Sequence, residues 1–206
     1  FDLVRKAGAE PVGVGETGFR QISNSKRPIL KPDDLKGIKI RVVGSPMYGE
    51  IMSTMGANPT FMSWADAQPA LASGAVDAQE NPLEVFLAAK IHTLGQKYVT
   101  KWNYSNDILL FAIANDAWKL WSAQDQGIVR EAAQDAARQQ IGIVRKLFAE
   151  DVERVRALGV EVHVPTAAEM ATWQAATRSV YAKWKTQVNA GLIGKIEQVV
   201  EKSRKA

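Results

Sequence analysis

The sequence predicts an α/β fold in two domains, and two observations support this. Between residues 38 and 95, short apolar runs alternate with segments of helical periodicity, which is the strand–helix order of a parallel sheet. Further along, apolar residues continue at helical spacing from about residue 123 to residue 158. A single helix of that length would measure about 50 Å. Because this is too long for one small α/β domain, we expect the helix to brace two domains.

The N-terminal residues predict a helix, a short strand and an irregular segment. Residues 1–7 carry apolar side chains at helical spacing, and residues 11–16 read as a short strand. Pro28 and Pro32 then interrupt any longer regular element. Residues 31–37 predict a single helical turn that leads into the alternating region.

Alternating strands and helices follow, and each helix has a local start signal. Ser45, Ser63 and Pro82 stand at the expected helix starts, where serine accepts a backbone hydrogen bond and proline fits the first turn. The predicted elements are a strand at 38–43, a helix at 45–56, an extended segment at 59–62, a helix at 63–74, a strand at 75–81 and a helix at 82–95. Strands joined through helices in this way lie parallel in one sheet.

The second half of the chain predicts further strands and two C-terminal helices. Residues 97–116 read as strand, turn and strand, and the uninterrupted apolar run Ile108–Ala114 is typical of a central strand buried on both faces. The remaining predicted elements are a short helix at 116–121, the long helix with Ser122 as its cap and Asp125 three residues on, and a strand at 160–164. A helix then runs from the Thr166–Glu169 capping box to about Asn189, and a last helix follows Gly191.

The composition excludes several classes of protein. Of the 206 residues, 46% are apolar and 23% are charged, which is ordinary for a globular protein. The net charge of +4 is small and is not gathered into one run, so we expect no nucleic-acid partner. The absence of cysteine excludes disulfides and thiolate chemistry. No stretch approaches the roughly 18 continuous apolar residues of a membrane span.

Common catalytic and cofactor motifs are missing from the sequence. There is no G-x-S-x-G elbow, no phosphate-binding Gly-Lys-Thr/Ser loop and no H-E-x-x-H pair. Glycines at 13, 15 and 18 resemble a dinucleotide fingerprint, but prolines follow them where that fingerprint needs a helix. His92 and His163 stand alone, without metal-ligand spacing, and we interpret both as structural. We therefore expect neither a cofactor nor a metal.

Three residues of the alternating region are candidates for ligand binding. Arg41 lies at the C-terminal end of a predicted strand, where α/β folds bind ligands, and a guanidinium suits two-pronged recognition of a carboxylate. It also fits a solvent-facing alternate position. Asn81, before Pro82, fits either a ligand contact or a helix cap. Trp64 fits either a ligand platform or the core.

Several stretches together resemble one family of proteins. They are GFRQISNSKRPI at 18–29, PDDLKGIKIRV at 32–42 and GANPTFMSWADAQPALASGAVDAQENP at 56–82. These stretches, in this order and spacing, resemble the DctP-like solute-binding proteins of tripartite ATP-independent periplasmic (TRAP) transporters, and the resemblance covers essentially the whole chain. It implies a periplasmic-binding-protein-like fold, with two α/β domains, a cleft, crossing strands and a long bridging helix.

The resemblance also implies ligand contacts at particular residues. Arg41 in KIRV resembles the family's carboxylate-binding arginine, and Arg20 in GFRQ resembles a second arginine that reaches the ligand. Asn81 in QENP resembles a ligand-bonding asparagine, and Trp64 stands where the family places an aromatic ring. A further ligand-lining stretch, in which the family's residue types vary, matches Trp102, Asn103 and Tyr104.

The resemblance leads us to expect a truncated chain. Family members are about half as long again, with the additional part at the N-terminus, and no signal peptide precedes Phe1. The expected domains are a partial domain I with a crossing strand at 1–20, a complete domain II at 21–106, and a return to domain I with the long helix and C-terminal helices at 107–206. An incomplete sheet has an open edge, so self-association is a further expectation.

The sequence thus predicts a periplasmic, non-enzymatic solute-binding protein that captures a small organic acid and delivers it to a TRAP membrane permease. A sensor domain of the same fold, coupled to a kinase, uses the same residues, and only the flanking genes would separate the two. An α/β enzyme with Glu80 or Asp77 as its base is a third hypothesis, although the chain has no nucleophile or cofactor motif. The sequence does not distinguish a sugar acid from a dicarboxylate, keto acid or aromatic acid.

Overall fold

The computed structural model describes residues 1–188 and 190–205, and the chain divides into two compact units. Each unit is assembled from separated stretches of sequence. Unit 1 comprises Phe1–Gln21, Asn81–Thr93 and Asn103–Val162, and unit 2 comprises Ile22–Glu80, Leu94–Trp102 and His163–Ala206. None of the described helices is long and apolar enough to cross a membrane.

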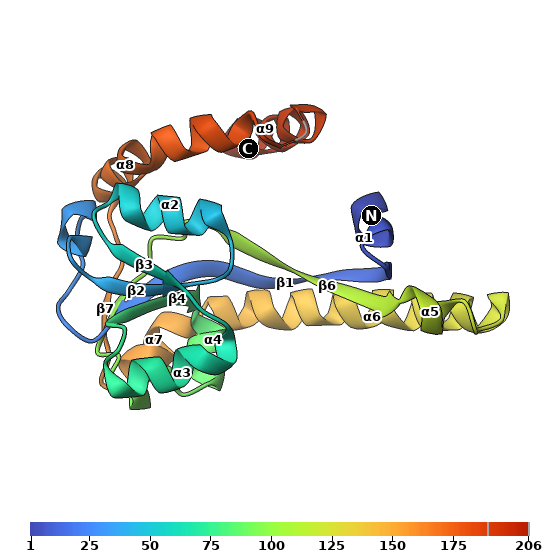
Figure 1. Ribbon diagram of the computed structural model, residues 1–206, viewed down its shortest axis with the longest axis horizontal. Helices are drawn as coiled ribbons and strands as arrows, with labels where there is room; N and C mark the ends of the chain where they lie inside the picture. The colour runs from blue at the N-terminus through green and yellow to red at the C-terminus, as the bar shows by residue number, and fades with distance from the viewer. Residues whose placement is uncertain (189, 206) are drawn as a thin grey trace. The chain divides into compact units, whose positions relative to one another are not determined.

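Unit 1 is built on a β-ribbon and a long helix that lies along it. Strand β1 (Ala9–Asn24) pairs antiparallel with β6 (Asn106–Ala114), from Ala9 opposite Ala114 to Phe19 opposite Asn106. Helix α6 (Ala123–Phe148) runs beside this ribbon (Figure 1). The other elements are α1 (Asp2–Lys6), α4 (Leu83–Ala88), the 3₁₀ turn η2 (Ile91–Leu94), α5 (Asn115–Trp118) and α7 (Asp151–Arg156).

Three glycines of β1 allow α6 to approach the strand closely. A Cβ atom added to Gly13 would lie 3.1 Å from the carbonyl oxygen of Ala133 in α6. One added to Gly15 would lie 2.5 Å from Oε1 of Gln140, and one added to Gly18 would collide with the ring of Phe148. The amide of Gln140 also bonds the backbone of Glu16 in both directions, at 3.0 and 2.7 Å. The spacing that resembles a nucleotide fingerprint is thus accounted for by helix packing.

Substituting Gly18 by alanine is expected to destabilise the protein by about 3 kcal/mol, because a methyl group overpacks the contact with Phe148 and the backbone is left-handed there. The φ angle of Gly18 is +104°. Thermal unfolding followed by circular dichroism should show a midpoint lowered by about 6–12 °C. Gly8 is the matched control, since its φ is +93° and nothing lies within 4 Å of its Cβ position. Equal losses for both substitutions would mean that the contact with Phe148 is not what requires glycine.

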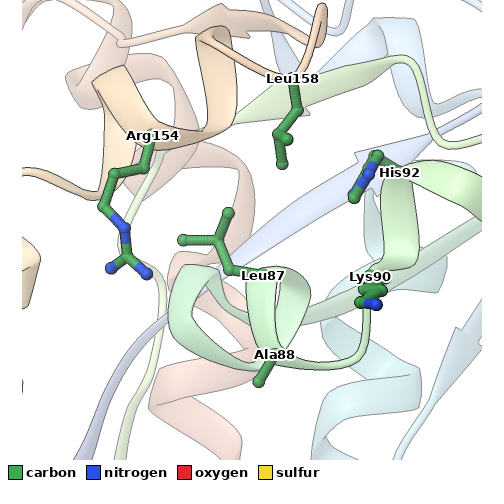
Figure 2. Close-up of a pocket in the computed structure, with 6 residues that line it drawn as sticks. All are labelled: Leu87, Ala88, Lys90, His92, Arg154 and Leu158. Atoms are coloured by element: carbon green, nitrogen blue, oxygen red, sulfur yellow. The ribbon is translucent and has the colours of Figure 1, made fainter.

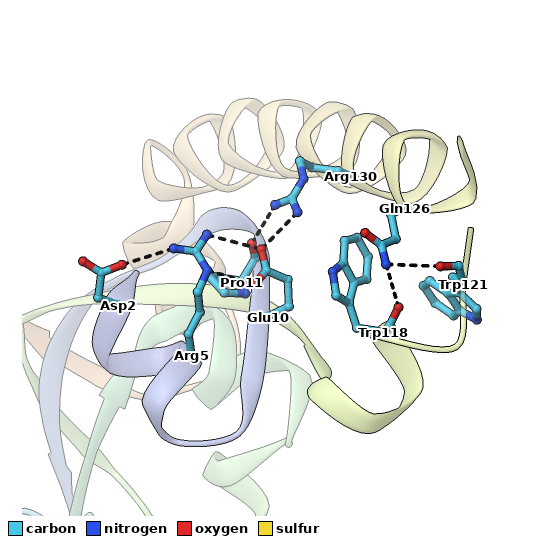
Figure 3. Close-up of polar contacts among 8 residues, drawn as sticks. All are labelled: Asp2, Arg5, Glu10, Pro11, Trp118, Trp121, Gln126 and Arg130. Carbon is cyan, nitrogen blue, oxygen red and sulfur yellow. Dashed lines mark hydrogen bonds and ion pairs between the residues drawn. The ribbon is translucent and has the colours of Figure 1, made fainter. Parts of the chain in front are cut away.

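Glu10 joins three elements of unit 1 (Figure 3). Its carboxylate accepts hydrogen bonds from Arg5 of α1 at 2.9 Å and from Arg130 of α6 at 3.0 Å. The hydrogen bond from Arg5, supported by that from Arg130, holds the pKa of Glu10 below its ordinary value. Arg130 also lies 5.1 Å from the centre of the Trp118 ring, and this contact fastens α6 to α5.

The single helix predicted over 123–158 is wrong, because the structure ends α6 at Phe148 and starts α7 at Asp151. The last turn tightens there, with the Glu150 amide donating to the Leu147 carbonyl at 3.0 Å. Helix α7 then packs against α4, where Arg154 donates to Glu84 at 2.5 Å. The apolar periodicity continues across the break without glycine or proline, so the break reflects tertiary contacts and not a local signal.

Unit 2 contains the predicted parallel sheet. Strand β2 (Lys39–Val42) pairs parallel with β3 (Asn58–Phe61) on one side and with β4 (Ala78–Pro82) on the other, which confirms the alternation of strands and helices. In the described part of the chain, the strand order is β3-β2-β4-β1-β5-β7, with β6 pairing β1. The other elements of unit 2 are η1 (Pro32–Leu35), α2 (Pro46–Thr54), α3 (Trp64–Ser73), β5 (Tyr98–Thr100), α8 (Ala167–Lys185) and α9 (Ala190–Lys205). Strand β7 (Glu161–His163) begins in unit 1 and reaches unit 2 at His163.

Most helix-start signals are confirmed. Ser63 accepts the Asp66 amide, Ser122 accepts the Asp125 amide, and Thr166 forms the full capping box with Glu169. Ser45, by contrast, makes no side-chain cap, although α2 starts directly after it at Pro46. Helix α8 ends at Lys185; Asn189, the predicted end, lies outside the described residues.

Two strand predictions and a second helix prediction differ from the structure. Residues 11–16 do form a strand, but it is part of the sixteen-residue β1, because the interrupting prolines fall only after Asn24. The helix expected at 82–95 is split into α4 and η2. The strand expected to be buried on both faces, β6, is largely exposed, and Ile108 is 71% accessible. An apolar run indicates that a strand favours apolar surroundings. The burial of that strand depends on which other elements of the described chain pack over it.

Candidate functional site

The candidate ligand-binding residues fall into two groups, one in each unit. We call them the Arg41 cluster (Arg41, Met62 and Trp64, in unit 2) and the Arg20 cluster (Arg20, Asn81 and Asp107, in unit 1). Both contain an arginine that is almost inaccessible to solvent, with exposures of 3% for Arg41 and 4% for Arg20. A buried guanidinium is costly unless partners hold it, so each cluster is described by those partners.

The Arg41 cluster stands at the carboxyl end of β2. Arg41 lies between Thr60 of β3 and Gln79 of β4 in the parallel register. Its Nε and Nη2 atoms donate to the carbonyl oxygen of Met62, at 3.0 and 2.8 Å. These hydrogen bonds fix the plane of the guanidinium and the direction in which it points.

Trp64 completes the Arg41 cluster from the first turn of α3. The guanidinium carbon of Arg41 lies 5.5 Å from the centre of the Trp64 ring, which is within the range of a cation–π contact. The Ser63 cap sets the start of α3 and therefore the position of this half-buried ring. The carbonyl of Met62 and the ring of Trp64 thus orient the guanidinium of Arg41.

The Arg20 cluster links β1, β4 and β6. Arg20 forms an ion pair with Asp107 of β6 and donates from Nη2 to Oδ1 of Asn81 at 3.2 Å. The structure thereby brings together two of the residues that the sequence nominated, Arg20 and Asn81. The hydrogen bond also orients the Asn81 amide, because its oxygen accepts from Arg20.

Asp107 is the member of the Arg20 cluster that sequence reasoning missed. It lies opposite Gly18 in the antiparallel register, close to Arg20 along the neighbouring strand. An acidic residue just before a long apolar run is only a weak indication that it pairs with a charged residue. The apolar run itself predicted a buried strand, in which a charged pair is not expected. Only the strand register identifies the arginine with which this carboxylate pairs.

The stretch Trp102–Tyr104 divides into residues with different surroundings. Asn103 is exposed and has a φ of +54°. Its side-chain oxygen accepts a hydrogen bond from Nε2 of Gln21 at 2.6 Å, and its backbone amide donates to Oε1 of Gln21 at 2.9 Å. Tyr104 is half-buried. Trp102 is 2% exposed, and its ring centre lies 4.6 Å from that of Trp173, so its side chain belongs to the core of unit 2.

The two carboxylates considered as catalytic bases are both buried, and one of them has a clear structural task. Asp77 accepts the Lys39 amide at 3.0 Å and pairs with Lys26 at 3.2 Å, which ties the start of β2 to the segment before β4. Glu80 is fully buried. Among the described residues, no group of three or more histidine, aspartate or glutamate side chains could hold a metal ion.

Comparison with known proteins gives one family model. The model described as "bacterial extracellular solute-binding protein, family 7" (DctP) matches residues 1–187. Among curated proteins, the 2,3-diketo-L-gulonate-binding periplasmic protein of Escherichia coli K12 is 34% identical over 159 residues, covering 75% of this chain and 47% of that protein. The chain spans about half the length of the curated relatives that it matches first.

Solved structures agree in fold. A TRAP periplasmic solute-binding protein from Ralstonia eutropha H16, with bound (S)-2-acetolactate, is 51% identical with a TM-score of 0.94, covering 98% of this chain and 66% of that one. One from Roseobacter denitrificans OCh 114, with bound L-galactonate, is 30% identical with a TM-score of 0.80, covering 87% and 58%. The predicted α/β fold of the periplasmic-binding-protein type is thus confirmed.

Proposed function

This chain belongs to the DctP family, family 7 of the bacterial extracellular solute-binding proteins, and on that premise we propose that it captures a small organic acid in the periplasm and delivers it to a TRAP-type membrane permease. The single observation that carries the proposal is the Arg41 cluster. A guanidinium that is 3% exposed, held by a carbonyl oxygen and an aromatic ring, is a preorganised receptor for a carboxylate.

The proposed roles follow from what each side chain offers. Arg41 forms a two-pronged salt bridge with the carboxylate, and Trp64 covers an apolar face of the ligand. Arg20 supplies a second positive field, moderated by Asp107, and Asn81 hydrogen-bonds the polar body of the acid. Asn103 and Tyr104 line the ligand, while Trp102 supports them from the core.

The ligand class that we propose is a small monocarboxylate with hydroxyl or keto groups. The Ralstonia eutropha structure, at 51% identity, contains (S)-2-acetolactate, and the Roseobacter denitrificans structure contains L-galactonate. The curated Escherichia coli relative is named for 2,3-diketo-L-gulonate. Each of the three acids has one carboxylate, which suits an arginine, and neighbouring oxygens, which suit an amide. A dicarboxylate, with its second negative charge, would match these two groups less well.

We propose that the protein binds this acid without transforming it, since its family is made of solute-binding proteins. The periplasmic location and the permease partner rest on the family in the same way. No feature of either cluster favours the sensor or the enzyme hypothesis.

Isothermal titration calorimetry with a panel of acids tests the proposal. We expect saturable binding of 2-acetolactate, pantoate and galactonate, and loss of binding for the matched amides, which keep the shape of each acid but lack its charge. Mass spectrometry of the ligand after incubation should show an unchanged mass. Equal affinity for acid and amide would contradict the carboxylate site, and conversion of the bound acid would contradict the non-enzymatic role.

A further inference from the structure

A cavity in unit 1 lies apart from the Arg20 cluster in its residues and its elements. Figure 2 shows its lining, which comes from the end of α4, from η2 and from α7 and the turn after it. The cavity has a volume of about 530 Å³, within the size range of small-molecule sites in proteins. Its lining residues are Leu87, Ala88, Lys90, His92, Arg154 and Leu158.

The lining separates into an apolar wall and a set of nitrogen groups. Leu87, Ala88 and Leu158 supply hydrocarbon, and Figure 2 shows the side chains of Leu87 and Leu158 pointing toward each other. Lys90, His92 and Arg154 supply an ammonium, an imidazole and a guanidinium, and none of the described residues that line the cavity is acidic. Such a lining suits a molecule with an anionic head and an apolar body.

Two of the nitrogen groups are not already committed to acidic partners. Arg154 pairs with Glu84, which lies outside the lining. Within residues 1–188 and 190–205, neither the Lys90 ammonium nor His92 has an ion-pair partner. The exposed Lys90 therefore brings to the cavity a positive charge that no described acidic side chain pairs with.

The backbone at Lys90 gives an independent observation. Lys90 follows α4 with a φ of +50°, in the left-handed region that favours glycine after a helix. Its carbonyl oxygen accepts from the Thr93 amide at 2.9 Å and from the Thr93 hydroxyl at 2.8 Å, and these bonds hold the turn into η2. A cationic side chain thus occupies a position where glycine would be less strained, directly at the cavity.

From this combination we infer that the cavity is a second binding site, separate from the Arg41 and Arg20 clusters, for a monocarboxylate with a short alkyl chain. Lys90 receives the carboxylate, and the His92 ring lies beside it in the lining. Leu87, Ala88 and Leu158 enclose the alkyl chain. The inference does not depend on the proposed transport function, because no residue of the cavity belongs to either cluster.

Nuclear magnetic resonance of the histidine ring protons tests this site in the intact protein. The chain has only two histidines, so His92 reports on the cavity and His163, in unit 2, is an internal reference. Titration with butanoate, hexanoate and octanoate should shift the His92 signal saturably and leave that of His163 in place. Affinity should rise by about threefold per added methylene, as expected for hydrocarbon leaving water.

Two variants of Lys90 separate the cation from the backbone. Lys90→Gly removes the ammonium at a position where glycine is favoured, so the protein stays folded, and octanoate affinity should fall by about tenfold. Lys90→Arg keeps the charge and should retain most of the affinity. Both variants should bind the acid of the Arg41 cluster as the unchanged protein does. The inference is overturned if octanoate leaves His92 unshifted, if octanol binds as well as octanoate, or if Lys90→Gly binds octanoate with full affinity.

Discussion

Replacing Arg41 by alanine is expected to weaken binding of the organic acid by about 100-fold or more, because the charged partner of a desolvated carboxylate is lost. Arg41→Lys restores the charge but not the planar fork, and we expect about a tenfold loss for it. Calorimetry on the three proteins, with one acid and one buffer, gives both ratios directly.

The strand that carries Arg41 also supplies the control. Lys39 is two positions earlier in β2 and is exposed, so Lys39→Ala removes a positive charge of the same strand without touching Met62 or Trp64. Its affinity should match that of the unchanged protein. If Arg41→Ala and Arg41→Lys both retain full affinity while their unfolding temperatures are normal, Arg41 does not hold the carboxylate.

Replacing Trp173 by alanine is expected to cost about 4 kcal/mol of unfolding free energy, because a large ring is removed from a closed core. Trp173 is 1% exposed on α8, and its ring meets that of Trp102 at 4.6 Å and an angle of 51°. The unfolding midpoint should fall by about 8–16 °C in thermal denaturation. The exposed Leu120, at 84%, gives a control whose replacement by alanine should leave the midpoint nearly unchanged.

A double-mutant cycle shows whether Trp102 acts in the core through Trp173. The double alanine variant should lose less stability than the two single variants combined, since the ring–ring contact is counted in both. A strictly additive cycle would mean that Trp102 and Trp173 are not energetically coupled, and the assignment of Trp102 to the core would then lose its support.

Sequence reasoning succeeded where the signal is local. The caps at Ser63, Ser122 and Thr166 are recognisable because a hydroxyl and an acidic residue three positions later meet within one turn. The break between α6 and α7 could not be recognised, because it depends on the contact of α7 with α4, which is distant in sequence. The helical period of apolar residues indicates which face of a helix is apolar, and it does not indicate where the helix ends.

The candidate site shows the same division. Arg41 could be nominated from its own strand, since a charge at the end of an apolar run is unusual. Arg20 and Asn81 were assigned to a ligand only through the family resemblance. Asp107 was not predicted, because it is 87 positions from Arg20 in the sequence and reaches it only through the pairing of β1 with β6. Whether Trp102 faces a ligand or the core is equally a property of distant residues, here Trp173.

The course of β1 has a consequence for how the chain acquires its structure during synthesis. The strand pairs Phe19 with Asn106 and, three residues on, Ile22 with Thr100. Neither unit is continuous in sequence, and unit 2 includes residues from His163 onward. A growing chain therefore cannot finish one unit before it starts the other, as a protein with sequential domains does. Closing such long loops is slow, and unit 2 stays incomplete until the residues from His163 onward have emerged.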